Sequence, residues 1–243
     1  MKVLVIGGGG YVGRIVQSSL EAHHQITYLD LRPIPGAEDR TFVGDLCDSE
    51  LVARALEGQD AVIYMAMGTL GGPTKKGWDD MDPSFNVNVR DQYRVLNIGL
   101  KQGVRKFVLI STLSVYKSTH VPYIRDESEP PDGFMSPYAI SKRLAENLHQ
   151  AAAQAYPDGV FLCLRFMLPR NEEDFAKSTP FDPALGLKNS CCMGPNDIRR
   201  LMLASLALET PGCHIVQTTG DLTGVRYPNT RATALLGWAP QGN

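Results

Sequence analysis

Apolar residues alternate along the chain between short continuous runs and the spacing of one helix face. A run over residues 1–6 ends in the glycines 7–10, and Val12, Ile15, Val16 and Leu20 then recur at helical spacing. Further runs of strand length lie at residues 26–29, 41–43, 61–65, 107–110 and 161–166. Helical spacing returns between them over residues 48–56, 83–102 and 137–156. Strands that alternate with helices predict an α/β fold, with a mostly parallel sheet covered by helices on both faces.

The alternation weakens after residue 166, where prolines are scattered and the apolar spacing breaks down. Only a helix over residues 196–209 and a strand over residues 214–218 are predicted there. We therefore expect a main domain over residues 1–166 and a small, loop-rich lobe over residues 167–243 that covers the sheet edge and is not an independent domain. In such sheets, ligands bind at the carboxyl ends of the strands.

Composition places the chain among globular proteins and excludes several classes of partner. Of its 243 residues 43% are hydrophobic and 21% are charged, and with a net charge of -2 and no basic patch no nucleic-acid partner is expected. The longest apolar run near the N-terminus covers residues 3–6, far short of the roughly 20 residues that span a bilayer, so no membrane segment is expected.

The cysteines and histidines point to reduced thiols and to no metal. The five cysteines are odd in number, unevenly spaced and preceded by no secretory segment, which favours a cytoplasmic protein. The neighbours Cys191 and Cys192 lack a third partner at ligand spacing, and so do His23 and His24. We therefore expect no metal site.

A glycine turn separates the first predicted strand from the first helix. Gly7, Gly10 and Gly13 form the pattern G-x-x-G-x-x-G, in which glycines permit positive φ and let backbone amides approach a pyrophosphate at the helix N-terminus. Asp30 ends the second strand roughly 20 residues beyond, where a carboxylate can bind the adenosine ribose hydroxyls. Because this carboxylate would repel a 2′-phosphate, NAD is favoured over NADP, although Arg32 follows closely.

These residues also have structural interpretations. The turn by itself is compatible with an ordinary glycine-rich loop, and Asp30 with an acid in a surface loop. Asp45, after the third strand, could accept a hydrogen bond from an adenine amino group, or could act as a turn residue or helix cap. The position of the turn between a strand and a helix favours the dinucleotide interpretation.

A tyrosine and a lysine share one face of the helix over residues 137–156. Tyr138 and Lys142 lie four residues apart on this helix, which Pro137 opens. An ammonium beside a phenol, together with a nicotinamide cation, favours the phenolate and lowers its pKa toward neutrality. An exposed tyrosine–lysine pair is the usual alternative. Hydroxyl residues at the carboxyl end of the preceding strand favour the chemical interpretation, because a reacting carbonyl would sit at that edge.

With these motifs the chain resembles an extended or atypical short-chain dehydrogenase/reductase of the NAD-dependent epimerase/dehydratase family, over roughly residues 1–240. The motifs that carry the resemblance are the glycine turn, Asp30, Asp45, Asn88, the strand end at residues 111–116, and the run Pro137-Tyr138-Ala139-Ile140-Ser141-Lys142. It implies a Rossmann-type, doubly wound fold whose residues 1–166 bind NAD, with residues 167–243 as the substrate lobe.

The resemblance also implies roles for individual residues. Thr112, Tyr138 and Lys142 are the expected catalytic set, with Ser111 and Ser114 as nearby candidates for the place of Thr112. Tyr138 would exchange the proton of a substrate hydroxyl, Thr112 would hydrogen-bond the same oxygen, and Lys142 would tune the tyrosine and hold a ribose hydroxyl. The expected cofactor site comprises Gly7, Gly10, Tyr11, Val12, Gly13, Asp30, Arg32, Asp45, Leu46, Ala66, Asn88, Tyr138 and Lys142. Asn88 would support a water chain at the active site, although a mid-helix asparagine also fits local packing.

Departures from the family pattern limit the types of reaction and substrate that we expect. Leu113 and Ser114 stand where dehydratases carry Asp-Glu, which disfavours dehydration. Only about 100 residues follow Lys142, so a smaller substrate than a nucleotide sugar fits better, and the segments 212–216 and 236–240 are similar to the ending of uronate dehydrogenases. We therefore expect an NAD-dependent oxidoreductase of sugar metabolism. It would transfer a hydride between the nicotinamide and a carbinol carbon of a small sugar or sugar acid.

Two alternative functions remain open. The first is a nucleotide-sugar epimerase that recycles its NAD internally, and the second is a non-catalytic NAD-binding sensor on the same fold. The resemblance further implies a homodimer formed through the helices that contain Asn88 and Tyr138. Four arginines are candidates for binding a substrate carboxylate or phosphate, although exposed surface positions suit each of them: Arg170, Arg199, Arg200 and Arg226.

Overall fold

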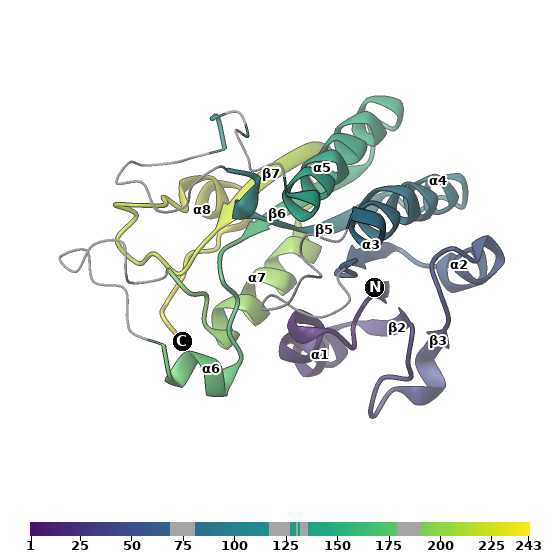
Figure 1. Cartoon of the computed structure of the whole chain (residues 1–243), viewed down its shortest axis with the longest axis horizontal. Coiled ribbons are helices and arrows are strands. Elements are labelled where there is room, and N and C mark those ends of the chain that lie inside the picture. The colour runs from purple at the N-terminus through teal and green to yellow at the C-terminus, as the bar shows by residue number, and fades with distance from the viewer. Residues whose placement is uncertain (69–80, 117–126, 130, 132–135, 179–190) are drawn as a thin grey trace.

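The computed structural model describes residues 1–68, 81–116, 127–129, 131, 136–178 and 191–243 (Figure 1). Seven parallel strands form one sheet in the order β3-β2-β1-β4-β5-β6-β7. The strands are β1 (Lys2–Ile6), β2 (Gln25–Asp30), β3 (Thr41–Val43), β4 (Ala61–Tyr64), β5 (Lys106–Thr112), β6 (Val160–Phe166) and β7 (Gly212–Thr218). The helices are α1 (Tyr11–His23), α2 (Ser49–Leu56), α3 (Met81–Phe85), α4 (Gln92–Lys101), α5 (Pro137–Ala155), α6 (Glu172–Ala176), α7 (Pro195–Ala207) and α8 (Thr230–Leu236).

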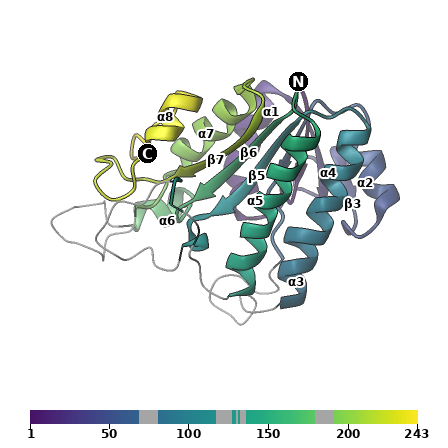
Figure 2. The same cartoon turned by 90° about the horizontal axis from the view of Figure 1, so that it is seen from above.

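Helices cover both faces of the sheet (Figures 1 and 2). On one face α1 packs against α7, and apolar residues such as Ile15 and Leu201 share a core with the strands. On the other face α2, α4 and α5 bury a second core that contains Val52, Leu96 and Ala145. The expected Rossmann-type α/β fold with a parallel sheet is confirmed.

The strand order reverses between β1 and β4, because β2 and β3 lie on one side of β1 while the chain returns to the other side. The carboxyl ends of the strands around this reversal form the usual ligand-binding crevice of an open α/β sheet. The turns that leave β1, β4, β5 and β6 are thereby brought to one edge. A surface concavity among Lys2, His24 and Gln25 lies at the opposite edge and includes none of the predicted site residues.

Several local elements differ from the sequence-based prediction. The helix expected over residues 83–102 is divided into α3 and α4 by a π-helical segment, Asn86–Asp91. The sequence pattern predicts neither α6 nor α8, because helices of five and seven residues are too short to produce a clear apolar period. Gly237 ends α8 in the left-handed conformation at φ 60°.

The segment after residue 166 contributes to the sheet itself. It supplies β7, the neighbour of β6, and α7, the neighbour of α1. Trp238 is 2% exposed in the core of the α1–α7 face and donates its indole N–H to the Asp197 carbonyl at 3.0 Å. The division at residue 166 stays a prediction. None of the helices described has both the length and the apolar character that crossing a membrane requires.

The glycine turn determines how closely α1 approaches β1. A Cβ at Gly13 would lie 2.1 Å from the Gly8 carbonyl oxygen, and one at Gly7 would lie 2.6 Å from the Ala66 amide nitrogen. Gly7 also has φ +79°, a conformation that favours glycine. The turn therefore requires glycine for backbone conformation at residue 7 and for close packing at residue 13.

We predict that Gly13→Ala lowers the free energy of unfolding by more than about 2 kcal/mol, because the rigid turn backbone must move to admit a methyl group. Gly58→Ala is the control: Gly58 has φ +67°, but a Cβ at this position would meet no atom within 4 Å, so only backbone strain of about 1 kcal/mol is expected. Denaturant unfolding measures both, and equal losses in the two variants would contradict the packing argument.

Candidate active site

The turn between β1 and α1 offers an anion-binding surface at the carboxyl edge of the sheet. Gly10 caps α1 without any side-chain hydrogen bond, so the first backbone N–H groups of the helix point toward the crevice without a capping side chain. The absence of side chains at Gly7 and Gly10 lets the turn pack closely, since a Cβ at Gly7 would lie 2.6 Å from the Ala66 amide nitrogen and one at Gly10 would lie 3.1 Å from the Gly7 carbonyl oxygen. A helix N-terminus with these open amides suits a diphosphate, so the residues present fit NAD.

Asp30 lies beside this turn. Its Oδ2 accepts the Gly9 N–H at 2.9 Å, and its Oδ1 accepts the Arg32 N–H at 3.3 Å. The carboxylate is thus oriented by two backbone amides and keeps lone pairs for a ribose hydroxyl. Asp30 therefore lies next to the glycine turn, whereas Arg32 is exposed beyond it, and the role of Asp30 in binding a ribose stays a prediction.

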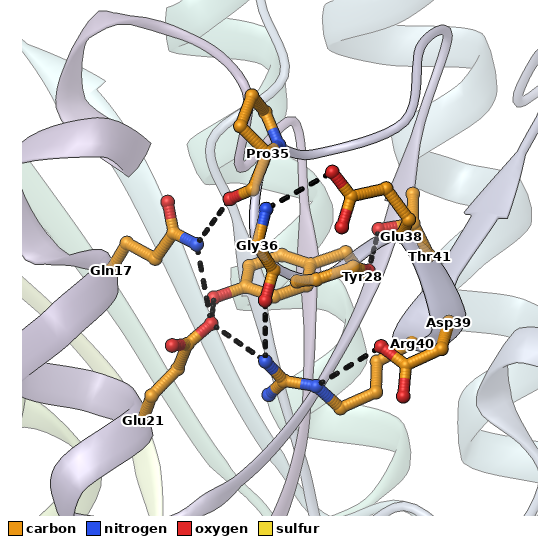
Figure 3. A network of polar contacts seen from close by, with 10 residues as sticks. Gln17, Glu21, Tyr28, Pro35, Gly36, Glu38, Asp39, Arg40 and Thr41 are labelled. Atoms are coloured by element: carbon orange, nitrogen blue, oxygen red, sulfur yellow. Dashed lines mark hydrogen bonds and ion pairs between the residues drawn. The ribbon is translucent and has the colours of Figure 1, made fainter.

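A polar network holds the connection between β2 and β3 against α1 (Figure 3). Tyr28 donates its hydroxyl to Glu21 Oε1 at 2.8 Å, and Arg40 and Gln17 each donate to the same oxygen at 3.3 Å. Gln17 also reaches the Pro35 carbonyl at 3.3 Å. Burial, followed by the bond to Glu21, raises the pKa of Tyr28. The network anchors the loop that follows Asp30.

The ring of Tyr28 also supports the glycine turn from below. A Cβ on Gly8 would lie 2.6 Å from a Tyr28 ring carbon, so the turn rests directly on the ring. Sequence reasoning missed this role, because a tyrosine within an apolar strand run looks like an ordinary core residue.

The other residues expected to bind the cofactor differ in their exposure and contacts. Asp45 is exposed and accepts the Cys47 N–H at 2.8 Å, so it serves as a turn residue. Leu46 is buried in the core, and Ala66 lies against Gly7. Val12 lies in the first turn of α1.

Tyr11 joins the glycine turn to the segment after β6. Its hydroxyl donates to the Asp174 carboxylate and accepts the Asn171 N–H at 2.9 Å. Burial and the bond to Asp174 raise the pKa of Tyr11. The hydroxyl of Tyr11 is therefore engaged by α6 and by Asn171, the residue that caps this helix.

Asn88 lies within the π-helical segment and links it to α5. The side chain is fully buried, and its Nδ2 donates to Ser141 Oγ at 3.0 Å. Within the described part of the chain its Oδ1 has no hydrogen-bond partner. A buried acceptor of this kind beside Lys142 suits an ordered water, and π-helical segments are frequent at functional sites.

Thr112, Tyr138 and Lys142 come together between β5 and α5. The hydroxyls of Tyr138 and Thr112 are hydrogen-bonded, and Thr112 also donates to Ser114 Oγ at 3.1 Å. Lys142 donates its ammonium to the Ile110 carbonyl at 2.9 Å. Thr112 and Tyr138 are each 7% exposed and Lys142 is 2% exposed, so all three predicted residues are buried.

Burial shifts the proton affinities of this set. Burial raises the pKa of Tyr138 to about 12, the direction opposite to that expected from the sequence, because the effect of burial outweighs the hydrogen bond with Thr112. It lowers the pKa of Lys142 to about 8, and Glu146 opposes that change. Strongly perturbed groups that cluster at the ligand edge of a sheet are typical of a site of proton transfer.

Some features of the site were not found from the sequence. Leu168, just after β6, has φ 41°, which is unusual for a residue with a side chain and marks local strain. Glu146 on α5 and Arg165 in β6 are both 2% exposed and form an ion pair at 2.8 Å. In the sequence, each of these two residues can be recognised as a charged residue at a position where the pattern predicts an apolar one.

Two of the candidate arginines form ion pairs within the protein. Arg199 pairs with Glu172, and Arg200 pairs with Asp197, so both guanidinium groups are engaged by acids of the protein. Arg170 lies close to Tyr11 and Asp174. Across the residues that the structure describes, no group of three or more His, Cys, Asp or Glu side chains is placed to hold a metal ion.

We predict that Tyr28→Phe lowers the free energy of unfolding by about 1 kcal/mol, since Glu21 loses a buried donor. It should also weaken NAD binding, because the ring then lacks its anchor beneath the turn. Tyr93→Phe, at a tyrosine 57% exposed, is the matched control. Denaturant unfolding and titration calorimetry with NAD measure both effects, and identical values in the two variants would disprove the anchoring role.

Lys142→Met should stabilise the protein by roughly 2 kcal/mol at pH 7, the cost of a buried ammonium less one lost hydrogen bond. The folded pKa of about 8 lies below the ordinary lysine value of 10.5, so the ammonium destabilises the fold below pH 8. The penalty disappears as pH rises from 8 to 10.5, because the folded state releases its proton first. The advantage of the variant over the natural protein should therefore shrink across this window.

Urea unfolding of both proteins between about pH 7 and pH 10 measures this dependence. Lys101→Met, at an exposed lysine of α4, is the control and should show a constant difference. A Lys142→Met difference that is also constant with pH would show that Lys142 carries no buried charge.

Comparison with protein-family models assigns residues 3–174 to the "NAD dependent epimerase/dehydratase family". Among curated relatives, the 2-alkyl-3-oxoalkanoate reductase of Stenotrophomonas maltophilia is 32% identical over 165 residues, which cover 64% of this chain and 47% of that protein. The UDP-glucose 4-epimerase of Erwinia amylovora is 28% identical over 186 residues, covering 70% of this chain and 53% of that protein. The chain thus spans about half the length of these relatives.

Solved structures show the same fold over nearly the whole chain. MoeE5 in complex with UDP-glucuronic acid and NAD superposes with a TM-score of 0.79 at 20% identity, covering 99% of this chain and 94% of that one. Uronate dehydrogenase from Agrobacterium tumefaciens gives a TM-score of 0.76 at 19% identity, with coverage of 99% and 84%. The family match extends over most of the chain and includes the glycine turn, Thr112, Tyr138 and Lys142. The chain therefore belongs to the NAD-dependent epimerase/dehydratase family, a family of enzymes whose cofactor is NAD.

Proposed function

We propose that this protein is an NAD-dependent dehydrogenase that acts on a hydroxyl-bearing carbon of a small sugar or sugar acid. The observation that carries the proposal is the hydrogen-bonded pair of Thr112 and Tyr138 hydroxyls, with buried Lys142 one helical turn from Tyr138. Two hydroxyls that contact each other at the carboxyl edge can both bond one substrate oxygen.

The roles of the residues follow from their proton affinities. Bound NAD supplies the carbon that accepts a hydride from the substrate, and its positive ring favours the phenolate of Tyr138. Tyr138 then takes the proton of the substrate hydroxyl at its Oη, while Thr112 donates a hydrogen bond to the same oxygen. Lys142, whose ammonium lies on the Tyr138 face of α5, stabilises that phenolate and holds a ribose hydroxyl of the cofactor.

We place the cofactor along the edge from the glycine turn to Lys142. Gly7, Gly10 and Gly13, with the backbone of Tyr11 and Val12, would hold the diphosphate, and Asp30 the adenosine ribose. Asp45 and Leu46 would lie beside the adenine, and Ala66 and Asn88 beside the rest of the cofactor. The open amides of α1 and the orientation of Asp30 support this assignment.

Two observations support a redox reaction on a small molecule. Leu113 is buried and Ser114 bonds Thr112, so no carboxylate follows Thr112 to serve an elimination. Similar folds include uronate dehydrogenase and MoeE5 with UDP-glucuronic acid, which makes acidic sugars the first substrates to test.

An epimerase is the second candidate, because UDP-glucose 4-epimerases are among the relatives. Such an enzyme oxidises and reduces its substrate in one site and shows no net NADH formation. Cofactor that stays bound through purification, together with sugar isomerisation, would favour it over the dehydrogenase.

The dehydrogenase predicts NADH formation from NAD and at least one member of a panel of uronic acids, aldoses and nucleotide sugars. Tyr138→Phe should lower kcat by at least about 100-fold, since the proton acceptor is lost. NAD affinity, measured by calorimetry, should change little. Tyr93→Phe is the matched control and should retain full activity.

Absence of NADH formation with every substrate, despite NAD binding, would overturn the dehydrogenase and leave the epimerase or a sensor. Chromatography of nucleotide sugars incubated with the protein separates those two: isomerisation indicates an epimerase, and its absence indicates a sensor. An active Tyr138→Phe variant would remove Tyr138 from the reaction.

The homodimer and the cytoplasmic location stay predictions. Large apolar side chains exposed on α4 and α5, Tyr93 at 57% and Leu144 at 36%, support a dimer through these helices, which light scattering can measure. All five cysteines are free thiols, which supports a reducing compartment.

A further inference from the structure

Three consecutive residues of β5 each bond a different residue of α5. The Ile110 carbonyl accepts from Lys142 at 2.9 Å, the Ser111 hydroxyl donates to Glu146 Oε1 at 2.7 Å, and Thr112 bonds Tyr138. Tyr138, Lys142 and Glu146 are spaced by four residues on one helix face. Glu146 is therefore the third member of a row whose other two members form the candidate active site.

The carboxylate of Glu146 is itself held from the neighbouring strand. Arg165 of β6 donates Nε to Oε1 at 2.9 Å and Nη2 to Oε2 at 2.8 Å, a two-point contact between side chains that are both 2% exposed. Arg165 further donates to the Tyr116 hydroxyl at 2.6 Å, just beyond the end of β5. A carboxylate held at both oxygens cannot change its orientation without breaking a bond to β5 or β6.

Stability alone gives no reason for this pair. Replacing a buried ion pair by apolar residues of similar volume is often neutral or stabilising, and β6 is otherwise composed of apolar residues with buried side chains. The pair lies where a second cation, the ammonium of Lys142, is buried one helical turn away.

From this geometry we propose that Glu146, fixed by Arg165 and Ser111, is a positioning residue that sets the register of α5 on β5 and keeps the ammonium of Lys142 charged at the active site. The inference rests on the proposed function, which gives Lys142 its part in the reaction. It names Glu146 as the residue that keeps Lys142 protonated.

The charged groups around Glu146 support the proposal that Glu146 keeps Lys142 protonated. Lys142 and His149 lie on the same helix, and Arg165 and Cys163 belong to β6. Cys213 on β7 and Tyr116 after β5 also lie within electrostatic reach of Glu146. Glu146 opposes the loss of charge that burial imposes on Lys142. Removal of the carboxylate should consequently lower the pKa of Lys142 below about 8.

The test is a direct titration of Lys142 in the cofactor-free protein. Protein labelled with carbon-13 lysine is followed by NMR from about pH 6 to pH 10, and Lys142→Met identifies the signal. Glu146→Gln should lower the pKa of Lys142 by about one pKa unit, a tenfold change in its dissociation constant. Glu57→Gln, at an exposed glutamate that follows α2, is the control: it removes a carboxylate outside this row and should leave the titration in place.

If Glu146→Gln does not fold, because Arg165 is left buried and unpaired, the double variant Glu146→Gln/Arg165→Met removes both charges and should still lower the pKa of Lys142. A titration that stays at the natural value in the folded variant, single or double, would overturn the proposal and leave an ion pair with a structural role only.

The pH dependence of kcat gives a second readout once a substrate is known. In Glu146→Gln, the alkaline loss of activity should begin at lower pH, by the same amount as the NMR titration moves. Since the NMR result requires no turnover, an unchanged titration contradicts the role of Glu146, whereas absent turnover contradicts only the proposed function.

Discussion

The docking of α5 on β5 is the interaction on which the candidate site depends. Neither element carries the chemistry alone, since the strand supplies the hydroxyl of Thr112 while the helix supplies the phenol of Tyr138 and the ammonium of Lys142. The lysine is bonded to a carbonyl of the strand rather than exposed to water. The free energy needed to bury that ammonium is offset by the rest of the fold, which holds both elements at fixed distance through the two cores.

Much of the fold could be predicted because the main elements are long and carry clear periods. Apolar runs located all seven strands of the sheet within a few residues, and the helical spacing of residues such as Ile15, Val52 and Ala145 placed the helices that cover the sheet. The glycine turn and Asp30 could be predicted to lie together because parallel strands end at the same edge. The structure brings Asp30 to the Gly9 amide.

The parts that could not be predicted depend on contacts between distant segments. Nothing local to Tyr28 indicates that its ring supports Gly8 or that its hydroxyl reaches Glu21. The π-helical segment around Asn88 has the same apolar spacing as an α-helix over a few residues, so the pattern cannot distinguish them. Glu146 and Arg165 look misplaced in the sequence until the strand and the helix are seen to lie side by side.

The position of β7 has a consequence for where the chain can be divided. A fragment that ends at residue 166 would retain the glycine turn, Tyr138 and Lys142, yet it would turn β6 from an interior strand into an edge. It would also uncover the side of α1 that packs on α7. Such a fragment would present unpaired backbone groups beside an apolar helix face, the surface from which sheets of separate molecules join. The last third of the chain thus keeps β6 inside the sheet and covers the side of α1 that packs on α7.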